Sequence, residues 1–157
     1  MPTTRRSLTL ALAAPLLFAA GEAAAESREF PSENGKVRVT TVISGLEHPW
    51  GLAFLPDGRM LVTERPGRLR IVTTDGTLSK PISGVPRVQA RGQGGLLDVA
   101  LHPEFNENGL VYLSFSEPGS GGAGTSVARG RLDGETLRDV QVIFRQSPKV
   151  DTGFHYG

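Results

Sequence analysis

Residues 51–72 read GLAFLPDGRMLVTERPGRLRIV, and they decide the fold class. Three short apolar runs in this stretch are separated by the turn sequences PDG and RPG. Glycine supplies the positive φ angle that a tight turn needs, so Asp-Gly between two apolar runs strongly predicts a hairpin. Three strands in succession leave no room for a helix. The stretch therefore predicts a small antiparallel sheet.

The same pattern occurs a second time farther along the chain. Its parts are an apolar run at residues 97–101, an Asn-Gly turn at 108–109, and predicted strands at 110–116 and 125–132. When Leu52 is placed on Val99, the two copies are offset by 47 residues. Repeats of about 40–50 residues with four strands each are typical of β-propeller blades. The sequence thus predicts an all-β propeller of antiparallel four-stranded blades, with a turn-rich β-sandwich as the alternative.

The alternation of apolar and polar residues over 36–43 predicts one more strand. A propeller closes by pairing a terminal strand with its last blade, and this strand is the one available for that pairing. Known propellers have about four to eight blades, whereas the repeat provides about two. We therefore expect an N-terminal piece of a longer protein, with a complete mature protein of residues 26–157 as the alternative.

Residues 1–25 predict a secretory signal peptide. Arg5 and Arg6 precede an uncharged apolar stretch at residues 8–20, which is too short to span a membrane. Small alanines then lead to an expected cleavage after Ala25. The start of the chain also resembles a twin-arginine export signal, with an ordinary Sec signal as the alternative. The mature protein is therefore expected to be periplasmic or secreted, with no membrane span after cleavage.

The composition excludes several classes of function. Lys plus Arg is 17 and Asp plus Glu is 16, a formal net charge of +1, so nothing predicts a nucleic-acid partner. The chain has no cysteine, which excludes disulfide scaffolds, thiol catalysis and Cys-ligated zinc. The three histidines lack a metal-ligand spacing such as HExxH. No metal ligand is therefore assigned within the predicted domain at residues 26–157.

Three sequence blocks resemble a known family. They are HPWGLAFLPDG at residues 48–58, GQGGLLDV at 92–99 followed by HPEF at 102–105, and FRQSPKVDTGFHYG at 144–157. Together, and in this order, they resemble the soluble quinoprotein sugar dehydrogenases of the glucose/sorbosone dehydrogenase family. That family includes periplasmic aldose sugar dehydrogenases that use pyrroloquinoline quinone (PQQ). The resemblance covers essentially all of residues 37–157.

The resemblance implies a six-bladed β-propeller, of which about the first two blades are present in this sequence. It also implies an oxidoreductase that oxidises an aldose at its anomeric carbon to the lactone, with hydride transfer to PQQ. Calcium and the basic residues that bind the quinone are expected from later blades. We therefore expect this stretch of chain to be inactive alone, and the acceptor of the quinone's electrons is left open.

By the resemblance, His155 matches the family's catalytic histidine, and Gln93 matches a glutamine near the sugar and the quinone. Histidine suits the removal of a hydroxyl proton because its ordinary pKa lies near the working pH. From the residues alone, His155 also fits a packed or loop position, and Gln93 fits a polar residue in a glycine-rich turn. Phe154 stands where related glucose dehydrogenases have an Asp, which leaves the partner of the imidazole open. His48 is a second candidate for the pocket, with a structural position beside Pro49 and Trp50 as the favoured alternative, and His102 is expected to be structural.

A second class of function stays open at this point. An exported propeller can bind a glycan or a protein without catalysis, because one fold hosts many functions. The feature that favours the enzyme is Gln93 together with His155 at one rim of the propeller. A binding module does not need an imidazole base there.

Overall fold

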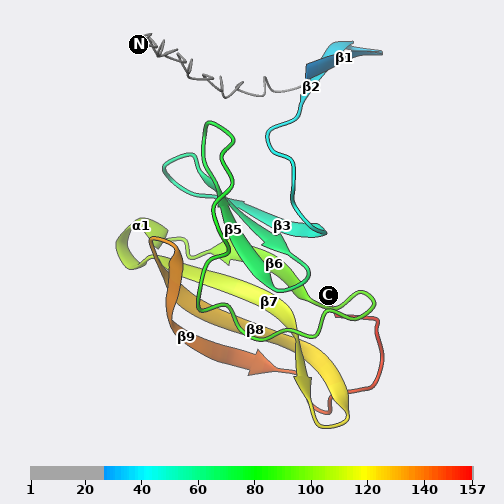
Figure 1. Cartoon of the computed structure of the whole chain (residues 1–157), viewed down its shortest axis with the longest axis vertical. Helices are drawn as coiled ribbons and strands as arrows, with labels where there is room; N and C mark the ends of the chain where they lie inside the picture. Colours follow the sequence, from blue (N-terminus) through cyan, green and yellow to red (C-terminus); the bar gives the residue numbers. More distant parts are fainter. Residues whose placement is uncertain (1–26, 157) are drawn as a thin grey trace, which may run out of the picture.

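The computed structural model describes residues 27–156, and nearly all of their regular structure is antiparallel β-sheet (Figure 1). The strands are β1 (Ser27–Ser32), β2 (Gly35–Thr40), β3 (Pro49–Phe54), β4 (Met60–Glu64), β5 (Arg68–Val72), β6 (Leu96–Leu101), β7 (Leu110–Gly119), β8 (Gly122–Asp133) and β9 (Thr136–Arg145). The predicted all-β fold class is confirmed. The predicted signal peptide and its cleavage after Ala25 lie outside the described residues.

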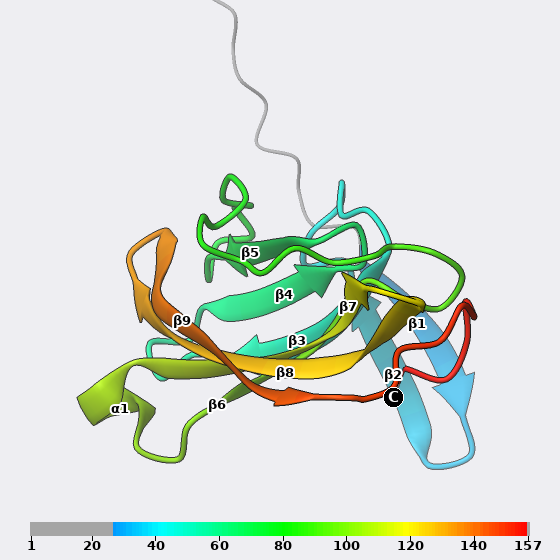
Figure 2. The same cartoon turned by 90° about the horizontal axis from the view of Figure 1, so that it is seen from below.

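Two sheets correspond to the two predicted copies of the repeat. The first has the order β3-β4-β5, and the second has the order β6-β7-β8-β9. In the first sheet, the position of the fourth blade strand is reduced to a bridge between Val72 and Leu78. The two sheets lie one over the other (Figure 2). Apolar side chains from both form one buried core, which includes Leu61, Leu69, Leu96, Val111, Leu113 and Phe115.

Strand β9 was not predicted. No strand is predicted after residues 125–132, but the chain turns at Asp133-Gly134, with Gly134 at φ 56°, and returns along β8 as the fourth strand. This outer strand is mostly exposed and carries charges such as Arg138 and Asp139, so it lacks the apolar run that marks the inner strands. The second sheet therefore has the full four strands of a blade.

A single helical turn, α1 (Phe105–Asn108), lies between β6 and β7 and ends at Gly109, whose φ of 64° is left-handed. The sequence predicted only a turn at this point. His102 orders the segment, because its Nδ1 accepts a 3.1 Å hydrogen bond from the Glu104 N–H and lies 2.9 Å from Asn108 Nδ2. Among residues 27–156 no helix is long and apolar enough to cross a membrane.

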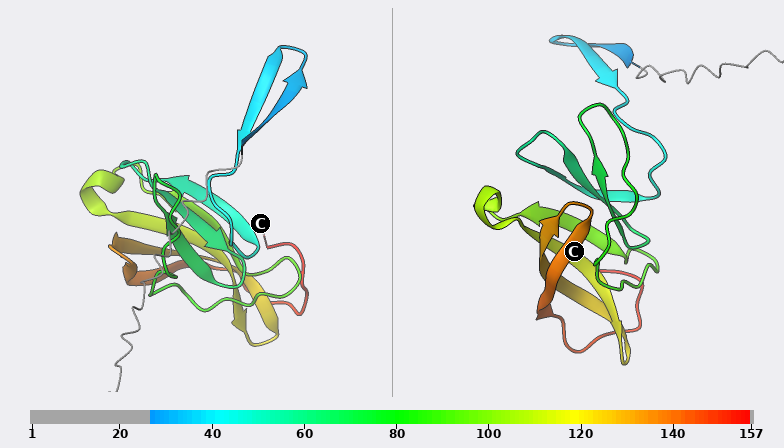
Figure 3. Two further views of the ribbon diagram at one scale, coloured as in Figure 1. Left: turned by 45° about the horizontal axis from the view of Figure 1, so that its top comes forward. Right: turned by 60° about the vertical axis from the view of Figure 1, so that its left-hand side comes forward.

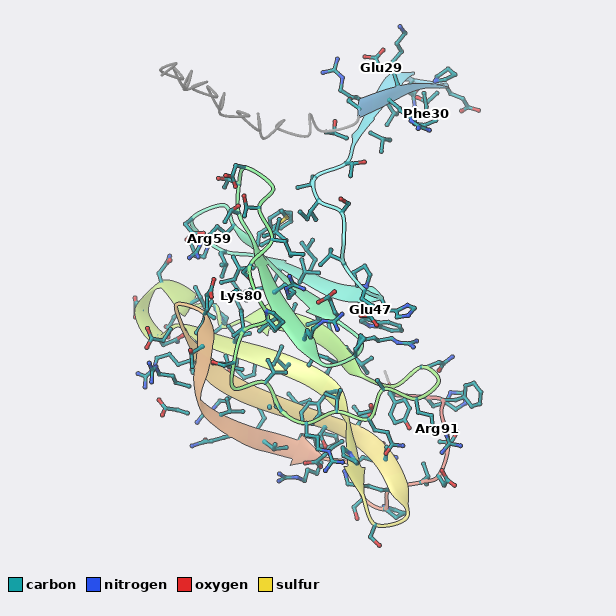
Figure 4. All side chains as sticks on the ribbon, in the orientation of Figure 1. Glu29, Phe30, Glu47, Arg59, Lys80 and Arg91 are labelled. Atoms are coloured by element: carbon teal, nitrogen blue, oxygen red, sulfur yellow. The ribbon has the colours of Figure 1, made fainter. Side chains whose placement is uncertain are left out.

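The strand predicted at residues 36–43 corresponds to β2, and its expected pairing with the last blade of a propeller stays a prediction. It pairs with β1 in a hairpin that stands apart from the two sheets (Figure 3). The turn signal Asn34-Gly35, where Gly35 adopts a φ of 124°, is not among the predicted turns. All residues of the hairpin are exposed, including Phe30, which Figure 4 labels at its outer end.

Candidate functional site

Two β-bulges form the floor of the candidate site. Strands β3 and β6 are the first strands of the two sheets, and they contact each other. The pairing of β3 with β4 shifts between Pro49 and Leu52, and the pairing of β6 with β7 shifts between Leu96 and Val99. The two bulges are 47 residues apart, so they occupy the same position in the repeat. Bulges of this kind redirect side chains and are frequent next to active sites.

Each bulge is held by a hydroxyl of the following strand. The Gly51 N–H donates to Thr63 Oγ1 at 2.8 Å, and the Asp98 N–H donates to Ser114 Oγ at 3.0 Å. The fully buried Thr63 hydroxyl also donates to the Leu97 carbonyl oxygen, which joins the first sheet to the second. The bulges are therefore fixed relative to each other.

The bulges also approach each other too closely for a side chain on Gly51. A Cβ at this position would lie 2.9 Å from Asp98 Oδ1 and 3.0 Å from the Leu97 carbonyl oxygen. Glycine is therefore required by the contact, and the space it leaves is occupied by Asp98. The carboxylate is further oriented by the Val99 N–H, which donates to Asp98 Oδ1 at 2.9 Å.

The end of the chain returns to the glycine-rich loop before β6, where Figure 4 labels Arg91. The Gln93 N–H donates to the Gly153 carbonyl oxygen at 2.7 Å, and the guanidinium of Arg91 pairs with Asp151 at 2.6 Å. A Cβ on Gly92 would overlap the Gly153 carbonyl. The loop and the C-terminal segment thus touch backbone to backbone.

This contact brings together the two site residues that the sequence singled out. Gln93 Oε1 accepts a 3.2 Å hydrogen bond from the backbone N–H of His155, across 62 residues of sequence. His155 has a φ of 64°, a left-handed conformation that is uncommon for a residue with a side chain. The Gln93 amide therefore helps to hold the backbone that presents the imidazole.

Tyr156 anchors the segment next to His155. Its ring is buried against Leu97 and Ala123, and its hydroxyl donates to the Thr152 carbonyl oxygen at 2.6 Å. The Tyr156 carbonyl oxygen accepts a 2.9 Å hydrogen bond from Thr125 Oγ1 on β8. His155 itself is exposed, so the chain places an accessible imidazole on a fixed support.

The loop, the bulges and the C-terminal segment line a cavity of about 440 Å³ that is open to solvent. Its lining consists of Trp50, Gln93, Leu97, Asp98, Ser114, His155 and Tyr156. The sequence alone predicts no functional role for Trp50, Asp98 or Ser114. The 47-residue repeat shows that Trp50-Gly51 and Leu97-Asp98 occupy equivalent positions. It does not show that these positions form a bulge, because a bulge is recognised only from the pairing of the strands.

The imidazole of His155 has no hydrogen-bond partner among residues 27–156. The ring centre of Phe154 lies 6.4 Å from that of His155, and the two rings are tilted by 56°. Asp98 lines the same cavity without bonding to the ring. The ring nitrogens are therefore available to a ligand.

His48 and His102 lie away from this cavity. His48 has a φ of 49°, and its carbonyl oxygen accepts a 3.0 Å hydrogen bond from the Arg65 N–H at the end of β4. The ring of His102 stacks on that of Tyr112, with centres 6.2 Å apart. In the described part of the chain, no three His, Asp or Glu side chains are grouped so that they could hold a metal ion.

A buried carboxylate supports the first sheet. Glu64 is fully buried at the end of β4 and accepts hydrogen bonds from Arg68, from Arg70 and from the Glu47 backbone N–H, at distances from 2.5 to 3.2 Å. Burial raises the pKa of Glu64, but these hydrogen bonds outweigh burial and lower the pKa to about 2. The carboxylate therefore stays ionised and ties the segment before β3 to β4 and β5.

Comparison with known proteins gives one consistent result. The family model described as Glucose / Sorbosone dehydrogenase matches residues 46–157. The Aldose sugar dehydrogenase YliI of Escherichia coli (strain K12) is 50% identical over 125 residues, which are 77% of this chain and 34% of that protein.

Two solved structures are similar in fold as well as in sequence. The soluble aldose sugar dehydrogenase of Escherichia coli in its apo form has 51% identity and a TM-score of 0.69, over 71% of this chain and 33% of that chain. The PQQ-bound form of the aldose sugar dehydrogenase of Streptomyces coelicolor has 30% identity and a TM-score of 0.61, over 80% of this chain and 35% of that chain.

The chain spans about a third of the length of these relatives. The matched region begins just before β3 and contains both sheets, the bulges and the C-terminal segment with His155. On this similarity, the chain belongs to the glucose/sorbosone dehydrogenase family.

Proposed function

We propose that this chain forms part of a PQQ-dependent dehydrogenase that oxidises an aldose at its anomeric carbon to the lactone. The observation that carries the proposal is the hydrogen bond of 3.2 Å between Gln93 Oε1 and the His155 N–H, which holds both residues at one cavity. The family match and the aldose sugar dehydrogenases among its relatives support the same reaction class.

In this reaction His155 acts as the general base. Its imidazole takes the proton of the anomeric hydroxyl while the C1 hydrogen leaves as a hydride. The anomeric oxygen and C1 then form the carbonyl of the lactone, and the existing bond between C1 and the ring oxygen is kept. When bound, PQQ supplies the acceptor for the hydride and its two electrons. Gln93 contributes by fixing the His155 backbone through Oε1, and its Nε2 hydrogens are directed to a sugar or quinone oxygen.

The lining of the cavity fits the sugar better than it fits the whole cofactor. PQQ carries three carboxylates, which need cationic partners, whereas the cavity presents Asp98 and no lysine or arginine. The residues of this chain thus fit the side of the quinone that meets the substrate. We propose that the groups that bind the carboxylates, and the calcium, come from outside residues 27–156.

The remaining parts of the proposal concern place and partners. We propose that residues 1–25 direct export and that the mature protein works in the periplasm or outside the cell. Its partners are an aldose and an electron acceptor that reoxidises the quinone. The near-neutral charge gives no support to a nucleic-acid partner.

The test is a His155→Ala variant of the protein as its gene encodes it, supplied with PQQ and calcium. We expect kcat for aldose oxidation with an artificial electron acceptor to fall about a hundred- to ten-thousandfold, the usual effect of losing a positioned base. Quinone binding should be retained. His48→Ala is the matched control, since His48 lies outside the cavity, and should keep its activity.

Two results would count against the proposal. Near-wild-type turnover by His155→Ala would show that another group is the base. A wild-type protein that oxidises no aldose with PQQ and calcium present would favour an exported propeller that binds a glycan or a protein without catalysis.

A further inference from the structure

Three side chains of the cavity have no part in the proton transfer described above. Trp50, Asp98 and Ser114 line the space next to His155, and the two bulges present Trp50 and Asp98 to it from neighbouring sheets. Bulges re-aim side chains and are over-represented next to active sites. The inference below rests on the proposed function and concerns the substrate at the same cavity.

The carboxylate of Asp98 is fixed in position, but only one of its two oxygens accepts a hydrogen bond within the described part of the chain. Its backbone N–H is bound by Ser114 Oγ, and its Oδ1 accepts the Val99 N–H at 2.9 Å. Contact with Gly51 limits its movement on the side of the first sheet. No side chain or backbone donor among residues 27–156 bonds to Oδ2. The carboxylate is thus oriented by the protein and still able to accept hydrogen bonds from a ligand.

Trp50 is 55% exposed despite being the largest apolar side chain of the chain and its only tryptophan. It belongs to the bulge of β3 and lines the cavity together with Gln93. An aromatic ring next to a carboxylate and an amide offers one flat apolar surface and several polar acceptors and donors. That combination matches a pyranose, which has C–H groups on its faces and hydroxyls around its edge.

We propose that Trp50 and Asp98 form a sugar-binding subsite beside His155. The Trp50 ring covers an apolar face of the aldose, and Asp98 accepts hydrogen bonds from hydroxyls next to the anomeric carbon. This places the substrate against the imidazole and gives the site its selectivity for sugars with hydroxyls in reach of Asp98. Asp98 is a binding residue in this arrangement, since no hydrogen bond joins it to the His155 ring.

The experiment uses Asp98→Asn and Trp50→Leu in the protein as its gene encodes it. Losing a hydrogen bond to a charged group costs about ten- to a hundredfold in affinity, so we expect KM for the aldose to rise by about that factor in Asp98→Asn. We expect kcat to change less than about threefold and the pH dependence of kcat to stay as in the wild type. Trp50→Leu should raise KM in the same direction.

A second readout is independent of turnover. Isothermal titration calorimetry of the protein prepared without PQQ measures aldose affinity directly, and both variants should bind the aldose more weakly than the wild type. The matched controls are Glu104→Gln, which removes an exposed carboxylate at α1, and Phe54→Leu, which alters an exposed aromatic on the same strand as Trp50. Both controls should bind the aldose as the wild type does.

Each contrary outcome would overturn a different part of the proposal. Unchanged KM and affinity in Asp98→Asn, with an active wild type, would remove Asp98 from substrate binding and leave the proposed function intact. A fall in kcat with a shifted pH profile and an unchanged KM would instead make Asp98 the orienting partner of His155. A wild type that neither binds nor oxidises aldoses would overturn the proposed function itself.

Discussion

The two sheets begin with the same backbone conformation, but they differ in which of the equivalent positions is a glycine. Each first strand starts just after a residue with positive φ, His48 in the first sheet and Gly95 in the second. In both, the carbonyl oxygen of that residue accepts a backbone hydrogen bond. The donor is the Arg65 N–H just after β4, at 3.0 Å, in the first sheet, and the Ser116 N–H within β7, at 2.9 Å, in the second. The backbone design of the repeat is therefore shared.

The bulge that follows is shared as well. Gly51 and Asp98 are equivalent, and so are the hydroxyls of Thr63 and Ser114 that accept their N–H groups. The Thr63 hydroxyl is fully buried and also donates to the second sheet, whereas Ser114 is partly exposed at the cavity. The same hydrogen bond thus serves the seam between the sheets in one copy and the site in the other.

The comparison shows what decides the placement of glycine. Gly51 faces the second sheet and Gly95 faces the Arg65 carbonyl oxygen of the first, so both lie at the seam. Their equivalents, Asp98 and His48, are exposed. A side chain is present where the repeat faces the cavity or solvent, and it is absent where the two copies meet.

The largest effect is expected for Gly95→Ala. A Cβ at this position would overlap the Arg65 carbonyl oxygen, and φ is 147°, a conformation that residues with side chains rarely adopt. We expect a loss of more than about 3 kcal/mol in the free energy of unfolding, in the range of severe backbone and packing defects. Urea unfolding followed by circular dichroism measures it.

His48→Gly changes the equivalent position in the first sheet, and it tests whether only the glycine at the contact between the sheets is needed for stability. Glycine relieves the left-handed strain of His48 but adds freedom to the unfolded chain, and the two effects are each about 1 kcal/mol and opposite in sign. The free energy of unfolding should therefore change by less than about 1 kcal/mol. Equal losses in both variants would contradict the assigned role of the seam.

The second effect concerns Glu64, which stands where the second sheet has the buried Phe115. Its folded pKa of about 2 lies below the ordinary value of 4.5. The ionised carboxylate therefore stabilises the fold above pH 4.5 by about 3 kcal/mol, and this contribution is lost as the pH falls from about 4.5 through 2. Glu64→Gln should lose stability at pH 7 and show less change between pH 5 and pH 2, in urea unfolding at each pH. If Glu64→Gln lost as much stability as the wild type between pH 5 and pH 2, other carboxylates would be responsible for that loss.

The sequence predicted the parts of the fold that are buried and regular. The inner strands appear as apolar runs between glycine turns, so both copies and their 47-residue offset were found. Strands β1 and β9 were missed because exposed strands need no apolar pattern, and only a turn marks them.

The site was predictable only in part. Gln93 and His155 were singled out through the family resemblance, and their roles stay proposals, although the structure brings them together. Asp98 lies inside an apolar run that was interpreted as an ordinary strand. The direction of its side chain depends on a bulge and on the contact with Gly51, which lies 47 residues earlier in the chain. A pattern of neighbouring residues cannot reveal a contact between residues so far apart in the sequence.

A third prediction concerns Thr63→Val, which removes a hydroxyl at the seam between the two sheets. Valine has nearly the same shape but lacks the hydroxyl, so the buried Gly51 N–H and Leu97 carbonyl oxygen lose their partner. Leaving buried polar groups unpaired costs about 1–3 kcal/mol, and the free energy of unfolding should fall by that amount. Hydrogen exchange of the Gly51 amide, measured by NMR, should accelerate in parallel. Unchanged exchange at Gly51 would mean that the hydroxyl does not hold the bulge.

The smallest effect is expected for Ser114→Ala, the same deletion in the second sheet. Ser114 is partly exposed, so water can replace its hydroxyl as the acceptor for the Asp98 N–H, and the loss of stability should stay below about 1 kcal/mol. The change should instead appear in the site, because the bulge that orients Asp98 loses its side-chain support. We expect KM for the aldose to rise modestly, about two- to fivefold for a fraction of one hydrogen bond, with kcat preserved. A loss of stability as large as that of Thr63→Val would show that both hydroxyls serve the scaffold equally, and that the difference between the seam and the cavity is not energetic.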